Sequence, residues 1–91
     1  MRIWGKILKE NHLLRDTVIE DYEPDTRTHK IMRALEMIAE EFDLPVPIWL
    51  DANIEEFRKI ARTQFRADSF VESVDFDYLE IQIIEEDDEY A

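Results

Sequence analysis

One amphipathic helix limits how this chain of 91 residues can fold. Apolar side chains recur at spacings of four, three and four, at Ile31, Leu35, Ile38 and Phe42. This period predicts a helix of about four turns with a single apolar stripe. The sequence DLPVP, residues 43–47, ends the helix, because a residue before proline avoids helical backbone angles. A helix with one apolar stripe packs on another layer, and extended apolar segments elsewhere in the chain predict that this layer is a β-sheet.

Three segments have the apolar, β-branched composition of strands, namely residues 2–9, 12–20 and 74–84. The first two flank Glu10 and Asn11, which predicts a hairpin with a tight turn. Gly5 lies inside the first strand, where a glycine often marks a bulge or a close backbone approach. In the last segment the apolar alternation changes phase at Tyr78, which predicts either a bulge there or a sheet partly covered on both faces.

The middle of the chain predicts a short strand and then a second helix. Residues 46–50, VPIWL, form an extended run beside two prolines, which suits an edge strand. Asn53 with Glu56 three residues later matches a capping box, so we expect the helix to start there. Apolar residues then follow along one helical face at Ile54, Phe57, Ala61 and Phe65.

The predicted order of elements is therefore β-β-α-β-α-β. We expect an α+β fold with one four-stranded mixed sheet and two helices on one face. The acidic last strand is placed beside the first, where Arg2, Lys6 and Lys9 face its carboxylates, and this gives the strand order 2-1-4-3. A ubiquitin-like β-grasp, with the order hairpin, helix, strand, strand, is the alternative. In this prediction residues 1–84 form a single domain and residues 85–91 an acidic C-terminal tail.

Missing residue types exclude several kinds of site. The chain has no Cys, which excludes disulfides, Cys-ligated zinc and thiol catalysis. A single glycine cannot build a Walker A loop, a dinucleotide-binding loop or a nucleophile elbow. The two histidines, His12 and His29, form no paired metal-binding motif. We therefore expect no metal and no cofactor, and the sequence gives no support for an enzyme.

Negative charge is concentrated at the C-terminal end. The net charge is −12, and residues 67–91 hold ten acids and no Lys or Arg. This balance argues against nucleic acid and anionic membranes as partners, because the long-range field repels phosphate. No apolar run reaches the 18 or so residues of a membrane span, and the basic N-terminal stretch lacks the apolar core of a signal peptide. The expected location is the cytoplasm.

The first helix starts with charges that are wrong for its position. A helix start bears a partial positive charge and favours Asp or Glu, yet this one begins with bases. Free N–H groups, hydroxyls and cations together predict a site for phosphate or carboxylate, formed by Thr26, Arg27, Thr28, His29, Lys30 and Arg33. The alternative is that these bases pair with acids just upstream, at Glu20, Asp21, Glu23 and Asp25.

A second basic group is a stripe of arginines at four-residue spacing, Arg58, Arg62 and Arg66, beside Lys59. It has the charge to hold phosphates or an acidic partner. We favour the interpretation that it neutralises the acidic segment that follows it. That segment ends in the acidic run 85–89, which lacks the ligand spacing and the Gly turn of a calcium loop.

Four aromatic residues fall on predicted strands, namely Trp4, Trp49, Phe76 and Tyr78. If the helices cover one sheet face, some of these rings remain on the other. An open sheet face rimmed by charge is a surface for a protein partner or a second copy of the chain. The alternative is that the four rings belong to the core.

The stretches DTRTHKI (25–31), PIWLDAN (47–53) and FDYLEIQIIEED (76–87) make the chain resemble a group of short, acidic, uncharacterised bacterial proteins. The resemblance covers nearly the whole chain. It implies a bacterial cytoplasmic protein of unknown function and transfers no catalytic residue. We predict an interaction module that binds itself or another protein through its open sheet face or its acidic end, with an anion-binding domain as the alternative.

Overall fold

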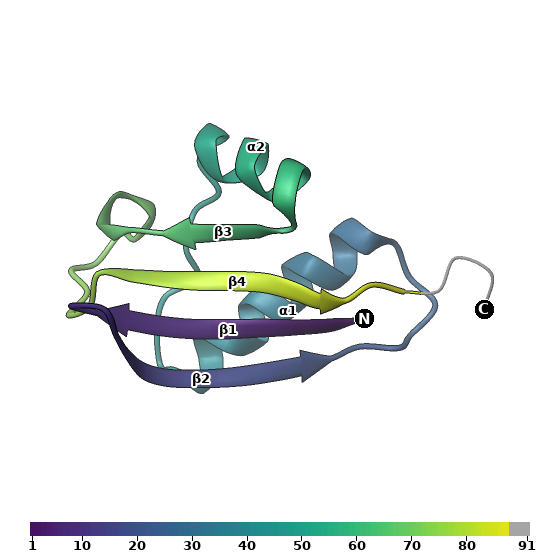
Figure 1. Ribbon diagram of the computed structural model, residues 1–91, viewed down its shortest axis with the longest axis horizontal. Helices are drawn as coiled ribbons and strands as arrows, with labels where there is room; N and C mark the ends of the chain where they lie inside the picture. The colour runs from purple at the N-terminus through teal and green to yellow at the C-terminus, as the bar shows by residue number, and fades with distance from the viewer. Residues whose placement is uncertain (88–91) are drawn as a thin grey trace.

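The computed structural model describes residues 1–87, which form a four-stranded sheet with two helices (Figure 1). The elements in chain order are β1 (Arg2–Lys9), β2 (His12–Glu20), α1 (Arg27–Glu41), α2 (Asp51–Ile60), β3 (Arg62–Phe65), a 3-10 turn (Ala67–Ser69) and β4 (Tyr78–Glu85). The sheet has the order β2-β1-β4-β3, and every neighbouring pair is antiparallel. The α+β class and the strand order 2-1-4-3 are confirmed, whereas the expected mixed sheet is wrong.

The third strand is not the segment that we expected. Residues 46–50 have no regular structure and lie in the connection between α1 and α2, whereas β3 follows α2. Pro45 and Pro47 have no N–H to donate to a neighbouring strand, which explains why this run does not join the sheet. The observed order is β-β-α-α-β-β. Its second helix before the last two strands distinguishes the fold from the β-grasp order.

The helix α2 ends before the apolar pattern suggests. Ala61 adopts a left-handed backbone conformation (φ 55°), and its N–H closes the last turn on the Phe57 carbonyl oxygen at 2.9 Å. Burial then alternates along β3, where Thr63 and Phe65 are buried. The four-residue spacing of Phe57, Ala61 and Phe65 is thus divided between a helix, its cap and a strand.

The hairpin of β1 and β2 is confirmed. Glu10 and Asn11 both have a positive φ (52° and 66°), as a tight hairpin turn requires. A bulge occurs in β2, where the register shifts and Leu14 has no partner. Tyr78 is the first residue of β4, so the change of phase there marks the start of a strand rather than a bulge.

Gly5 lies where α1 crosses the sheet. A Cβ atom at this position would come within 2.8 Å of the Ile38 side chain of α1, which is closer than side chains pack. Ile38 is fully buried, so it cannot move aside into solvent. The glycine therefore permits the close approach of helix and sheet that its place in the strand predicted.

A single core fills the space between the helices and one sheet face. It contains the apolar stripe of α1, Phe57 of α2, and inward side chains of the strands such as Ile3, Phe65 and Ile81. Within residues 1–87 no helix covers the opposite face, which is turned toward the viewer in Figure 1. None of the helices in this range is both long and apolar enough to cross a bilayer.

Candidate binding surfaces

The bases at the start of α1 are paired with carboxylates of the chain itself. Thr26 caps the helix, with its Oγ1 accepting the His29 N–H at 3.2 Å. Beyond this cap, each base has an acidic partner: Arg27 with Glu86 at 2.9 Å, His29 with Asp25 at 3.0 Å, Lys30 with Asp87 at 2.9 Å, and Arg33 with Asp21 at 2.7 Å and Asp25 at 3.1 Å. The upstream acids therefore account for two of the bases, and the C-terminal segment accounts for the other two.

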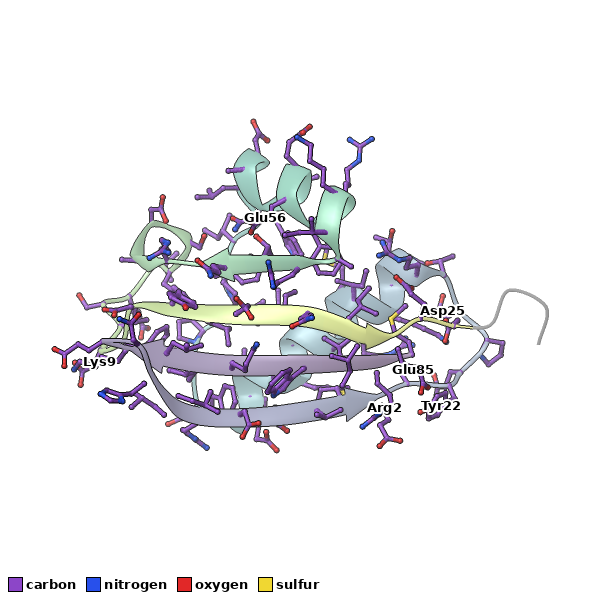
Figure 2. All side chains as sticks on the ribbon, in the orientation of Figure 1. Arg2, Lys9, Tyr22, Asp25, Glu56 and Glu85 are labelled. Carbon is purple, nitrogen blue, oxygen red and sulfur yellow. The ribbon has the colours of Figure 1, made fainter. Side chains whose placement is uncertain are left out.

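Lys30 anchors the beginning of the predicted acidic tail. The residue is 3% exposed, and its ammonium also donates to the Asp21 carbonyl oxygen at 3.3 Å. Asp87 accepts from the Met1 amine at 2.7 Å as well, so two cations meet at one carboxylate. Figure 2 shows Asp25 and Glu85 at this end of the molecule. Residues 85–87 are thus held against the domain, while residues 88–91 of the predicted tail lie outside the described residues.

A hollow of about 740 Å³ lies beside Lys30 on this side of α1. Its charged lining is mostly acidic, with Glu23, Asp25, Glu85, Glu86 and Asp87. The carboxylates occupy the hydrogen-bond donors that an anion would use, and their charge repels one. The anion site over Thr26, Arg27, Thr28, His29, Lys30 and Arg33 stays a prediction, and its strongest cations are already neutralised.

These contacts shift the acids that make them. Hydrogen bonds from the Thr26 N–H, from His29 and from Arg33 lower the pKa of Asp25 to about 2. Hydrogen bonds from the Met1 amine and from Lys30 lower the pKa of Asp87. Partial burial favours the neutral form of Asp21, but the hydrogen bond from Arg33 outweighs it and lowers the pKa of that carboxyl as well.

The lowered pKa values predict acid sensitivity of the fold. A carboxyl whose folded pKa is depressed stabilises the fold above its unfolded pKa of 3.8 and loses that contribution as the pH falls toward the folded value. We expect the free energy of unfolding, measured by urea denaturation, to fall between about pH 4 and about pH 2. Asp25→Asn should be less stable than wild type at pH 6 and should show a shallower fall, whereas parallel curves would contradict the role of Asp25.

The arginine stripe does not neutralise the acidic end within residues 1–87, because Glu86 and Asp87 pair with α1 instead. Arg66 donates to the Gln64 side chain at 2.8 Å and lies over the Tyr78 ring. In the described part of the chain, Arg58 and Arg62 have neither an ion pair, nor a side-chain hydrogen bond, nor an aromatic ring beneath them. Every other Lys and Arg in residues 1–87 has at least one such contact: Arg2, Lys6, Lys9, Arg15, Arg27, Lys30, Arg33, Lys59 and Arg66.

The four predicted surface aromatics divide into two pairs. Trp4 and Tyr78 are half-buried on the face of the sheet that α1 does not cover. Trp49 instead packs edge-on against Phe57 and Phe65, with ring centroids 5.6 and 4.9 Å apart. Phe76 precedes β4 and packs edge-on against Phe70 at 5.7 Å. The sequence could not separate the pairs, because it places Trp49 and Phe76 on strands that do not form there.

The uncovered face, called the open face below, carries a network of polar contacts. The Lys6 ammonium pairs with Glu80 at 2.7 Å and lies 3.9 Å from the centre of the Trp4 ring. Glu80 is 7% exposed and also accepts from Gln64 at 3.2 Å. The Trp4 indole N–H donates to Asp16 at 2.9 Å. These contacts link all four strands across the face.

Charge on the open face differs between its two edges. Asp16 and Glu20 lie on β2 at one edge, and Arg62 with Arg66 lie on or beside β3 at the other. Exposed apolar side chains lie between and beside them, at Leu13, Val18 and Ile84. The face is therefore acidic along one edge, basic along the other and partly apolar between.

A second hollow, called the helix groove below, lies between α1 and α2 and measures about 180 Å³. It is lined by Arg27, Thr28, Ile31, Met32, Trp49, Ile54, Phe57 and Arg58. The Trp49 indole N–H is buried and has no acceptor in residues 1–87. Sequence reasoning missed this groove, because it placed Trp49 on a strand and the helix stripes in the core. The exposed Met32 and Ile54 at the edges of those stripes are the signal that was present.

Comparisons with known proteins add no relative. No protein-family model matches the chain, and neither the curated proteins nor the solved structures contain a match. No group of three or more His, Asp or Glu side chains in residues 1–87 is placed to hold a metal ion. The resemblance to short acidic bacterial proteins stays a prediction, and any function has to be argued from the surfaces themselves.

Proposed function

We propose that the protein is an interaction module that pairs with a second copy of itself through the open face. The observation that carries the proposal is the opposite charge of the two edges of that face, with Asp16 and Glu20 on one side and Arg62 and Arg66 on the other. A face with this distribution is complementary to itself after a two-fold rotation.

The strand register defines the complementary arrangement. Val18, Trp4, Gln82 and Arg62 form one row across the sheet. A two-fold axis that runs along the strands between β1 and β4 places β2 of one copy against β3 of the other. Arg62 of one copy then lies between Asp16 and Glu20 of the other, and Trp4 lies near the axis. The unpaired Arg62 gains acidic neighbours in this arrangement, which favours association.

The size of the face sets the expected affinity. Eight residues along β1, at about 3.3 Å each, and four strands, at about 4.8 Å each, give a face of roughly 500 Å². Two such faces bury roughly 1,000 Å², which is the lower limit for a specific interface. We therefore expect a weak dimer with a dissociation constant on the order of 10 μM.

Reciprocal charge reversal tests the arrangement. Sedimentation velocity of the wild type, from about 1 μM to about 1 mM, should show a shift from monomer to dimer. Arg62→Glu and Glu20→Lys should each be monomeric over this range, because each places like charges opposite one another. The double variant should recover the dimer, since the two edges exchange their charges.

Arg58→Glu is the matched control, because it makes the same change of charge on the helical side and should leave the dimer intact. A wild type that stays monomeric at about 1 mM would overturn the proposal. A dimer that survives in both Arg62→Glu and Glu20→Lys would place the interface elsewhere and would also reject this arrangement.

A further inference from the structure

The helix groove has an apolar floor of a definite size. Ile31 and Phe57 belong to the core cluster and Trp49 packs against it, so the floor is fixed by the fold. Its volume of about 180 Å³ is slightly larger than an apolar cavity of about 150 Å³ that accepts benzene. A body the size of one aromatic ring therefore fits between α1 and α2.

The charge at the rim of the groove is positive. Arg58, on α2, lines the groove and has no acidic partner within residues 1–87, although the chain as a whole has a net charge of −12. Arg27 and Thr28, in the first turn of α1, line the opposite side. The groove thus includes the part of the α1 start that is turned toward α2, away from the carboxylates around Lys30. The acidic hollow and the helix groove have opposite preferences for charge.

We propose that the helix groove binds a small amphipathic monoanion, an aromatic ring carrying a short carboxylate arm. The ring lies on Ile31, Trp49 and Phe57, and the carboxylate pairs with Arg58. Apolar burial supplies the contact area, and an arginine without a partner supplies a charge-assisted hydrogen bond. The site lies on the helices and not on the open face, so it is independent of the proposed self-association.

A single negative charge suits this protein better than many. The long-range field of a chain with a net charge of −12 repels a polyanion more strongly than a monoanion, and it attracts cations. A preference of the groove for an anion over a cation of the same shape would therefore run against the overall charge. Such a preference has to come from local contacts, with Arg58 as the unpaired cation.

The two tryptophans allow a direct test by NMR titration. The indole N–H of Trp49 reports on the groove, and that of Trp4, which donates to Asp16, reports on the open face. We expect 3-phenylpropionate to shift the Trp49 signal saturably, with a dissociation constant on the order of 1 mM, and to leave the Trp4 signal unchanged. The cation 3-phenylpropylamine, which has a similar body, should bind at least about tenfold more weakly at the groove.

Two variants separate the groove from a general effect of charge. Arg58→Gln should weaken binding of 3-phenylpropionate by about tenfold or more, because it removes the partner of the carboxylate. Arg62→Gln removes the other unpaired arginine and should change nothing. Equal binding of the amine, an unchanged affinity in Arg58→Gln, or a shift of the Trp4 signal alone would each overturn the proposal. Binding that persists in monomeric Arg62→Glu would show that the groove functions without the dimer.

Discussion

Lys6→Met is expected to lower the free energy of unfolding by about 3 kcal/mol. The variant keeps the apolar stem of the side chain over Trp4 but removes the ammonium that lies 2.7 Å from Glu80. Glu80 is 7% exposed and would keep Gln64 as its remaining side-chain donor, at 3.2 Å. A charge that is buried without its partner costs far more than the pair itself contributes, and urea denaturation at a fixed protein concentration measures this cost.

Two comparisons test the cause of that loss. Lys9→Met removes an ion pair with Asp75, whose side chain is fully in solvent, and should cost less than about 1 kcal/mol. The double variant Lys6→Met with Glu80→Leu removes both charges and should recover most of the stability lost in the single variant. If the double variant were as unstable as Lys6→Met, packing of the lysine stem rather than the isolated carboxylate would explain the loss.

Asn53→Ala is also expected to cost about 3 kcal/mol, because three buried or partly buried hydrogen bonds disappear together. The Asn53 side chain accepts the Leu50 N–H at 3.1 Å, which satisfies the start of α2. Its amide donates to the Thr63 hydroxyl and to the Gln64 carbonyl oxygen, each at 2.9 Å. One side chain thus joins the start of α2 to β3, and thermal or urea denaturation of the variant measures the joint.

Asn53→Asp separates the two roles of this residue. It keeps an acceptor for the helix start but loses both donors to β3, so it should remain well below the wild type in stability. Glu56→Ala is the control, because Glu56 is exposed on α2 (Figure 2) and makes no side-chain hydrogen bond within residues 1–87. We expect a change of less than about 0.5 kcal/mol for this control. A larger loss in Glu56→Ala than in Asn53→Ala would favour the capping box that the sequence suggested.

Local signals in the sequence predicted the hairpin, α1 and the strand order. The order 2-1-4-3 came from charge, and Lys6 does pair with Glu80 across β1 and β4. The same reasoning failed at β3, because Phe57, Ala61 and Phe65 have a spacing that fits a helix. Ala61 ends α2 in a left-handed conformation that glycine usually adopts, so no residue type marked the boundary.

The surfaces were less predictable than the fold, because they depend on contacts between distant parts of the chain. Arg27 and Glu86 are 59 residues apart, and the spacing of neither gives any sign of the other. The bases at the start of α1 looked available and are paired, whereas Arg58 and Arg62 looked neutralised and are not. The helix groove likewise depends on how the connection at Trp49 folds back between α1 and α2.

The contact between Gly5 and Ile38 has a consequence for how this sequence can diverge. Any relative with the same fold that has a side chain at position 5 needs a smaller residue at position 38, because the two positions share one volume between β1 and α1. The pair should therefore change together in evolution, although 33 positions separate its members in the chain. A set of diverged sequences can be recognised as sharing this fold by that joint change, even where the surface residues of the open face and the helix groove have been replaced.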